Sequence, residues 1–250
     1  AIKYNKHIIV EKPICLTKYQ LKKIYNLSRK KKLFLSTNLV LRVNDLFNKF
    51  KKKINKKNLY YIEADYLWGR KYKLLQWRSK IKNYSLTLGA GIHVIDLIIW
   101  LAEEKPVSVQ AFSNNRGLNS KIFKKDSFFI YILKFSSGLI AKVTANGSCS
   151  HNHFHEVKIF ERNKTTVNSF MGAYKFQKIK NKTIFQLEKG KYPDKKNRGK
   201  LIINFIDRII NNKNKNNLND IKEAIDVMTV CFACDESASK KKQIKIKYLK

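Results

Sequence analysis

One stretch, residues 84–103, constrains the fold of this chain more than any other. It reads YSLTLGAGIHVIDLIIWLAE, and from position 92 onward only His93, Asp96 and the final glutamate are not apolar. The length of the run and the absence of proline predict a buried helix, whose first turn Thr87 can cap with its hydroxyl. His93 and Asp96 are three residues apart, so they share one side of this helix. They either satisfy each other in the core or belong to a functional site.

The composition excludes several classes of protein. The chain has 250 residues, of which 44% are hydrophobic, so it can bury the core of one or two domains. No apolar run reaches the length of a membrane span, and the start of the chain is not a signal peptide. Four cysteines in a chain this long do not make a disulfide framework. We therefore expect a cytoplasmic protein without membrane association.

A formal net charge of +35 raises the question of nucleic-acid binding. The basic residues are nearly all lysines and are spread along the whole chain. Specific readout of bases and phosphates favours the planar fork of arginine. Because no nucleic-acid-binding module accompanies the charge, we expect salt-sensitive association with polyanions but no specific nucleic-acid partner.

The first 42 residues have the pattern of one parallel βαβ unit. A short apolar strand is predicted at 7–11 and a longer one at 33–41. Thr17 begins a helix between them, and Gln20 stands where a capping-box partner is expected. A crossover of this length joins parallel strands. A single unit is less than the mononucleotide-binding half of a doubly wound sheet.

Residues 43–250 have a different pattern, in which short strands follow one another. A basic helix is predicted at 45–54 and further helices at 201–210 and 220–238, with a polar loop at 211–217. Short turns between the predicted strands favour antiparallel hairpins. The strands are predicted at 59–67, 107–113, 127–135, 139–145, 154–160 and 165–170, with weaker ones up to 187. The predicted fold class is α/β followed by α+β, with an open, mostly antiparallel sheet and flanking helices.

Lys12 is a candidate catalytic residue because Glu11-Lys12-Pro13 stands at a predicted strand end. Open α/β sheets bind ligands beyond the carboxyl ends of their strands. Pro13 favours an extended conformation for the lysine before it. A solvated loop lysine is the alternative interpretation of so short a motif.

Three other patterns are weaker indications of a functional site. Gly89-Ala90-Gly91 lacks the third small residue and the acidic residue of a dinucleotide fingerprint, so we reject that interpretation. His151, His153 and His155 alternate and would share one face of a strand, but no acidic or cysteine ligand accompanies them, so a polar loop is favoured over a metal site. The pair Cys231 and Cys234 lies in an amphipathic helix, which favours core packing.

The order of several motifs resembles the Gfo/Idh/MocA oxidoreductases, a family that contains glucose–fructose oxidoreductase, inositol dehydrogenase and nucleotide-sugar dehydrogenases. The motifs are EKP, TNLVLR, WR, GIHVIDLIIWL and DVMTVCFACDESA, and they extend over essentially the whole chain. HFHEVKIF and KYPDKKNRGKLIINFID further resemble the branch associated with surface-sugar biosynthesis.

This resemblance implies a nicotinamide-dependent enzyme with two domains. Residues 1–42 would be the C-terminal part of an NAD(P)-binding Rossmann domain, and residues 43–250 the substrate-binding and oligomerisation domain. Lys12 and His93 are implied as catalytic residues, with Asp96 orienting or touching the substrate. The resemblance places further residues near the cofactor: Glu11, Pro13, Arg42, Trp77 and Arg78.

The chain departs from the family pattern in two respects. It has no Gly-rich strand–turn–helix, so we expect Ala1 to be the start of a fragment. Many members have an acidic residue four positions before the histidine, and Gly89 stands there in this chain. A catalytically incompetent remnant that serves as a scaffold is therefore the alternative to an enzyme.

The sequence thus predicts an NAD- or NADP-dependent oxidoreductase that acts on a carbinol of a sugar or nucleotide sugar. Imidazole has a pKa near ~6.5, so His93 suits the role of base at neutral pH, and a cationic Lys12 would stabilise the developing alkoxide. The sheet is predicted to form the face of a homodimer or homotetramer. The residues expected to meet the partner are Phe128, Ile130, Ile132, Val143 and Ala145.

Overall fold

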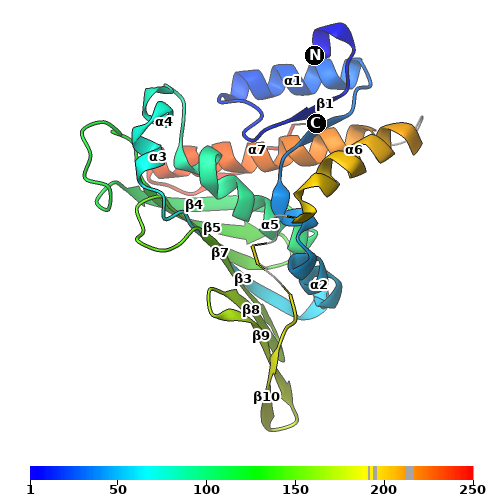
Figure 1. The fold of residues 1–250 in the computed structure, drawn as a ribbon, viewed down its shortest axis with the longest axis vertical. Coiled ribbons are helices and arrows are strands. Elements are labelled where there is room, and N and C mark those ends of the chain that lie inside the picture. Colours follow the sequence, from blue (N-terminus) through cyan, green and yellow to red (C-terminus); the bar gives the residue numbers. More distant parts are fainter. Residues whose placement is uncertain (191, 194–195, 212–216, 250) are drawn as a thin grey trace.

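An open sheet of nine strands organises the computed structural model, which describes residues 1–190, 192–193, 196–211 and 217–249 (Figure 1). The strands are β3 (Leu59–Leu67), β4 (Pro106–Asn114), β5 (Phe128–Phe135), β6 (Ile140–Asn146), β7 (Phe154–Glu161), β8 (Lys164–Ser169), β9 (Gly172–Ile179), β10 (Lys182–Leu187) and β11 (Ile244–Lys245). Their order across the sheet is β10-β9-β8-β7-β3-β6-β5-β4-β11. The predicted strands are confirmed to within two residues at nearly every end.

All neighbouring strands pair antiparallel except β3 and β6, which are parallel. The predicted hairpin between β5 and β6 is confirmed, and Gly138 occupies its turn with φ +89°, a conformation that suits glycine. Strand β3 lies between β6 and β7, so the hairpins on its two sides become one continuous sheet. The predicted fold class, an open and mostly antiparallel sheet after a βαβ unit, is confirmed.

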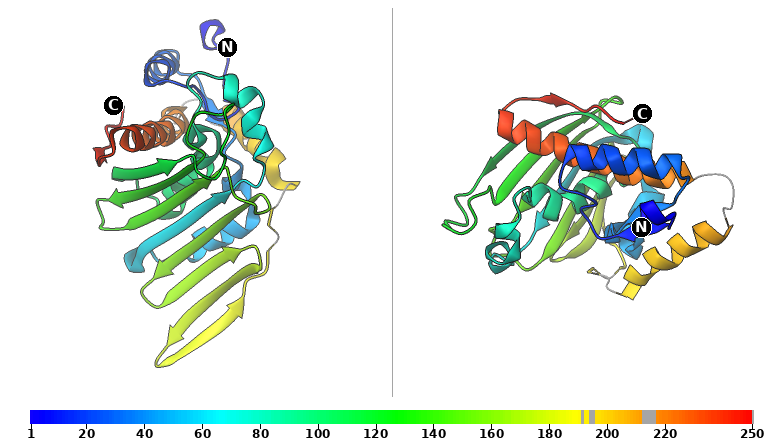
Figure 2. Two further views of the ribbon diagram at one scale, coloured as in Figure 1. Left: turned by 90° about the vertical axis from the view of Figure 1, so that its left-hand side faces the viewer. Right: turned by 90° about the horizontal axis from the view of Figure 1, so that it is seen from above.

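Helices in the described part of the chain gather on one face of this sheet (Figure 2). The chief ones are α5 (Ile92–Ala102), which contacts β3 and β6, and α7 (Asn217–Lys240), which contacts β4 and α5. Side chains alternate along each strand, so every second residue meets these helices. Ile62 and Ala64 of β3 are fully buried in this way, as are most apolar residues of α5.

The same alternation corrects part of the predicted partner surface. Tyr131 of β5 lies opposite Val143 of β6, and both are buried in the core, as is Ala145. Ile130 and Ile132 flank Tyr131, so they point to the other face of the sheet, where they are half-buried. Val143 and Ala145 therefore cannot meet a partner; the prediction treated residues on opposite faces of the sheet as one surface.

The βαβ unit is confirmed as parallel. It consists of β1 (Ile8–Val10), α1 (Lys18–Lys30) and β2 (Leu35–Thr37). Thr17 caps α1 by accepting a hydrogen bond from the backbone N–H of Gln20 at 3.2 Å, and the Gln20 side chain accepts one from the N–H of Leu16 at 3.0 Å. Strand β2 is shorter than predicted because a 3-10 helix, Val40–Val43, begins soon after it.

The boundary after residue 42 stays a prediction. It falls inside the 3-10 helix Val40–Val43. Helix α7 contacts α1 and β2 as well as the large sheet, so the last long helix joins the two predicted domains. The βαβ unit and both chain ends lie near one end of the sheet, and the β9–β10 hairpin lies at the other (Figure 1).

The remaining helices are α2 (Asp45–Lys53), α3 (Tyr72–Leu75), α4 (Trp77–Lys80) and α6 (Lys200–Asn211). Residues 212–216, which form most of the polar loop predicted between the last two helices, lie outside the described part. Among the described helices, none has both the length and the apolar character that crossing a membrane requires.

The start of the helix predicted at 84–103 differs from the expectation. A π-helical turn, Thr87–Gly91, precedes α5. Ser85 rather than Thr87 caps it, since the Ser85 hydroxyl accepts a hydrogen bond from the N–H of Leu88 at 3.1 Å. The Thr87 hydroxyl instead bonds the phenol of Tyr131 at 2.7 Å, a partner on β5. Such π-helical turns are frequent at functional sites.

Candidate active site

A pocket of about 510 Å³ lies where the ends of β1 and β2 face the sheet. Residues from six separate parts of the chain line it, because the βαβ unit, α5, the central strands and the segment before α6 converge there. Its polar lining consists of Glu11, Lys12, Asn38, Asn44, Tyr66, Arg70, His93, His153, His155, Tyr192 and Arg198.

Lys12 follows β1 and is half-buried in this pocket. Its ammonium donates a hydrogen bond to the carbonyl oxygen of Gly89, in the π-helical turn before α5. Burial and, to a smaller extent, Arg78 lower the pKa of Lys12 to about 8, against the opposing effect of Glu11. Lys12 is therefore mostly cationic at neutral pH but close to titration, as expected of a lysine with a chemical role.

His93 stands one turn into α5 and presents its ring to the same pocket. Its Nδ1 atom is buried and has no hydrogen-bond partner within the described residues. Burial, reinforced by the Lys12 cation, holds the pKa of His93 well below its ordinary value of 6.5. The imidazole is neutral at physiological pH and has a free nitrogen, so it can accept a proton or a hydrogen bond from a ligand.

Two more histidines join this pocket, from the start of β7. His155 is 6% exposed, shares a hydrogen bond between its Nδ1 and the Tyr192 hydroxyl, and leaves its Nε2 atom without a partner. Burial, with smaller contributions from Arg70 and Arg198, lowers the pKa of His153 to about 4. The sequence singled these residues out for their alternation, but not as members of a pocket with His93.

His151 does not join its two neighbours. Strand β7 begins at Phe154, so His151 and His153 precede the strand and the three rings do not follow its alternation. The His151 ring packs against Phe170, at 5.1 Å between centroids. Within the described residues, no group of three or more histidine, cysteine, aspartate or glutamate side chains could hold a metal ion.

Asp96 belongs to a different environment from His93. It is fully buried, and its carboxylate accepts hydrogen bonds from Nε of Arg42 at 3.0 Å and from Nη2 at 2.6 Å. Burial raises the pKa of Asp96, and the Arg42 guanidinium opposes that rise. The two residues therefore neither satisfy each other nor share a pocket, and Asp96 holds the βαβ unit to α5 through Arg42.

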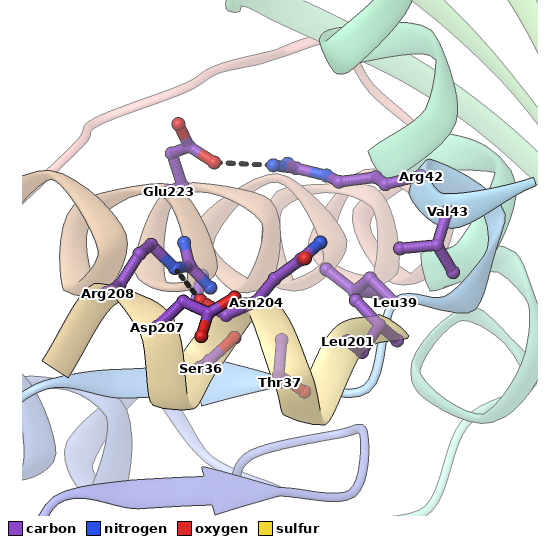
Figure 3. A pocket seen from close by; sticks show the side chains of 11 residues that line it. Ser36, Thr37, Leu39, Arg42, Val43, Leu201, Asn204, Asp207, Arg208 and Glu223 are labelled. Atoms are coloured by element: carbon purple, nitrogen blue, oxygen red, sulfur yellow. Dashed lines mark hydrogen bonds and ion pairs between the residues drawn. The ribbon is translucent and has the colours of Figure 1, made fainter. Parts of the chain in front are cut away.

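Arg42 reaches a second pocket, of about 470 Å³, between β2, α6 and α7. Figure 3 shows Arg42 pointing from the 3-10 helix toward Glu223 of α7, with which it forms an ion pair, across from Asn204 and Leu201 of α6. Arg42, which the resemblance places near the cofactor, thus lies beside the first pocket without lining it. Its guanidinium is already paired with two carboxylates.

The other implied cofactor residues lie at different distances from the pocket. Glu11 lines it and accepts a hydrogen bond from the Asn38 amide at 2.6 Å. Pro13 follows Lys12 through a cis peptide bond and faces away, toward α1. Trp77 is exposed on α4, and the Arg78 guanidinium lies 4.2 Å from the centre of its ring. Arg78 acts on the pocket electrostatically, through its effect on the pKa of Lys12.

Sequence reasoning missed the two arginines of the pocket. Arg70 follows β3, and Arg198 lies in a 3-10 helix, Lys196–Gly199, before α6. The scarcity of arginine was the available signal: because most basic residues of this chain are lysines, each arginine was a candidate for a specific role. The prediction for Cys231 and Cys234 is confirmed: both are fully buried in the core.

The comparisons with known proteins agree with this geometry. Residues 58–167, from the end of the 3-10 helix before β3 into β8, match the family model of the GFO/IDH/MocA C-terminal domain. Among curated proteins, none matches the chain in sequence.

Several solved structures share the fold of nearly the whole chain, which is compared with three of them by TM-score, sequence identity and the share of each chain that is aligned. The chain is similar to myo-inositol 2-dehydrogenase from Lactobacillus plantarum, with a TM-score of 0.79 and 16% identity over 99% of this chain and 75% of that one. It is also similar to levoglucosan dehydrogenase in complex with NADH, with a TM-score of 0.81 and 17% identity over 100% and 76%. For UDP-N-acetylglucosamine 3-dehydrogenase from Acidithiobacillus ferrooxidans the TM-score is 0.77, with 15% identity over 96% and 73%.

At these identities the structural similarity establishes the fold, and the family match is limited to residues 58–167. Both agree with the order of motifs in the sequence. The resemblance is thereby confirmed: residues 58–167 match the C-terminal domain of the Gfo/Idh/MocA oxidoreductases, within a chain that has the fold of the solved dehydrogenases.

Proposed function

We propose that the protein is a nicotinamide-dependent oxidoreductase that acts on a carbinol of a sugar or nucleotide sugar. One observation carries the proposal: a cationic lysine and a neutral histidine with an unpartnered nitrogen line the same pocket. The two residues come from β1 and α5, which are far apart in the sequence, so their convergence is a property of the fold. The dehydrogenases with the same fold act on polyols, sugars and a nucleotide sugar, which supports this substrate class.

The residues present fit the reactive end of a nicotinamide cofactor. The pocket lies beyond the carboxyl ends of parallel strands β1 and β2, where open α/β sheets bind nucleotides. The unpartnered Nδ1 of His93 and the single backbone partner of Lys12 leave both groups able to contact a ligand. We propose that Glu11 and Lys12 border the nicotinamide and that Arg78 adds positive potential. In the described chain no Gly-rich loop joins a strand to a helix.

In the proposed reaction a bound NAD or NADP supplies the hydride acceptor. His93 is neutral at pH 7 and takes the proton of the substrate hydroxyl. Lys12 donates a hydrogen bond to the same oxygen and stabilises the negative charge that develops on it. Its bond to the Gly89 carbonyl fixes the direction of the ammonium. Asp96 acts only indirectly, by holding Arg42 and α5 in place.

The test adds NAD or NADP and a panel of polyols, sugars and nucleotide sugars to the purified protein and follows nicotinamide absorbance. His93→Ala and Lys12→Met should each lower kcat by roughly 10²–10⁴-fold, the usual effect of removing a positioned acid–base group. His151→Ala is the matched control, because His151 lies outside the pocket and should leave kcat unchanged.

The pH dependence gives a second measurement on the same protein. Lys12 loses its proton as the pH rises through about 8, so kcat/KM should fall above that value. It should stay level down to pH 6.5, because the pKa of His93 lies well below that. A folded protein that transfers hydride from no member of the panel would support the scaffold alternative instead.

A further inference from the structure

We propose that this pocket takes an anionic sugar, whose carboxylate or phosphate group binds between Arg70 and Arg198. The inference rests on the proposed function and narrows its substrate class. It is supported by the distribution of charge, by the partners of the arginines and by the depth at which each group lies.

The charge of the lining is strongly unbalanced. Lys12, Arg70 and Arg198 are cationic, while Glu11 is the single carboxylate among the described lining residues. The Glu11 carboxylate already accepts a hydrogen bond from Asn38. A neutral polyol would leave this excess of positive charge without a counter-charge, whereas an anionic ligand would balance it.

The two arginines have no protein partner that explains their presence. Within the described residues, the side chains of Arg70 and Arg198 make no hydrogen bond or ion pair, whereas the Arg42 side chain nearby is held by two carboxylates. The guanidinium group offers a planar fork of donors that matches carboxylate and phosphate oxygens. Unpaired arginines that line a pocket therefore indicate a ligand with such oxygens.

The histidines of the pocket serve a different purpose from the arginines. Burial, reinforced by the Lys12 cation and to a smaller extent by Arg198, keeps the pKa values of His93 and His155 well below 6.5, so these rings stay neutral. The buried Nε2 of His155 has no partner in the described part of the chain and can bond a sugar hydroxyl. The neutral imidazoles can bind hydroxyl groups, and the arginines can bind an anionic group. The pocket therefore fits a ligand that has both hydroxyl groups and a negative charge.

The depth of these groups gives the ligand an orientation. His155 is buried and His93 half-buried, whereas Arg70 and Arg198 are exposed. The sugar ring would therefore enter toward Lys12 and His93, and its anionic group would stay at the mouth of the pocket. A cavity of about 510 Å³ leaves room for a hexose and its charged substituent.

The experiment measures binding by calorimetry without cofactor, so it does not depend on turnover. The probes are glucuronate, glucose 6-phosphate, glucose and inorganic phosphate. At least one of the two anionic sugars should bind the wild-type protein ~10-fold or more tightly than glucose. Arg70→Gln and Arg198→Gln should each weaken binding of that anionic sugar by roughly 10-fold, or about 1.4 kcal/mol, because each removes a charge-assisted hydrogen bond. Glucose binding should not change.

Arg162→Gln is the matched control, because Arg162 is an exposed arginine in the turn between β7 and β8, away from the pocket. An equal loss of affinity in this control would show that the net charge of +35 attracts the probes non-specifically, and would overturn the proposal. So would wild-type affinity in both pocket variants, or binding of inorganic phosphate as tight as that of the sugars. Circular dichroism checks that each variant is folded.

The two anionic sugars distinguish the sources of the group. Preference for glucuronate would assign a carboxylate, and preference for glucose 6-phosphate would assign a phosphate. Binding that depends on both arginines without any hydride transfer would contradict the proposed function alone. Hydride transfer from a neutral sugar that is unaffected by either arginine variant would contradict the present inference alone.

Discussion

At the scale of single residues, Gly89 decides how Lys12 is held. Lys12 donates to the carbonyl oxygen of Gly89, and the Tyr84 phenol fills the space beside its Cα atom. A Cβ atom at position 89 would lie 1.9 Å from the Tyr84 hydroxyl oxygen. Tyr84 is 5% exposed, so its ring cannot swing into solvent without opening the core. The glycine is required by this close approach.

We therefore expect Gly89→Asp to destabilise the fold rather than to restore an acidic group beside His93. Overpacking of this kind costs about 1–3 kcal/mol in the free energy of unfolding. Tyr84→Ala combined with Gly89→Asp should recover part of the loss caused by overpacking. Urea unfolding measures these changes, with Gly199→Ala as a control, because nothing lies within 4 Å of a Cβ there. A Gly89→Asp protein with wild-type stability and higher activity would contradict this expectation.

At the scale of elements, α5 uses two neighbouring sides for two purposes. His93 faces the pocket, while Asp96, one turn later, is clamped to Arg42 of the 3-10 helix Val40–Val43. The π-helical turn before α5 brings the Gly89 carbonyl to Lys12. Both contacts tie α5 to the βαβ unit, so the helix positions the lysine and the histidine relative to each other.

Asp96→Ala should lower the free energy of unfolding by about 3 kcal/mol, since it leaves a largely buried guanidinium without its main partner. Glu223→Ala is the matched control: the Glu223 side chain is 60% exposed, and its removal should cost less than about 1 kcal/mol. Chemical denaturation measures both. Wild-type stability of Asp96→Ala together with a large loss of turnover would place Asp96 in the reaction instead.

At the scale of the whole molecule, the second face of the sheet remains without a cover in the described structure (Figure 2). Ile130 and Ile132 of β5 point to it, and Phe112 of β4, opposite Ile130, is 58% exposed. An antiparallel sheet commonly has one face packed on the core and the other in contact with water. An uncovered face with exposed apolar side chains, as here, favours contact with a partner.

We predict that this face joins two copies of the chain. Light scattering at micromolar concentration should give twice the chain mass, or four times if dimers associate further. Phe112→Glu together with Ile130→Glu should give a folded monomer, because buried carboxylates would be unpaired across the two-fold axis. Tyr4→Glu, at a residue that is 73% exposed in the 3-10 helix Ile2–Tyr4 before β1, is the control and should not change the mass. A wild-type monomer would contradict the prediction.

The sequence alone was sufficient for most of the local structure. Alternating apolar residues located the strands of the sheet, and Thr17 with Gln20 located the start of α1. Each of these features depends on short-range geometry: the period of a strand, the period of a helix, or a hydroxyl that reaches a nearby N–H. The order of short motifs was likewise enough for the family resemblance, because that order is written along the chain.

Only the tertiary structure decided which groups meet. His93 and Asp96 share a helix, but one faces Lys12 and the other Arg42, and the spacing of three residues could not tell the two sides apart. The alternation of β5 and β6 could not show that Val143 lies in the core while Ile130 does not, because that depends on the register between the strands. Arg70 enters the pocket from the loop after β3 and Arg198 from a 3-10 helix, two segments that no local pattern connects. Long-range packing determines which of these side chains come into contact, and that packing depends on the whole chain at once.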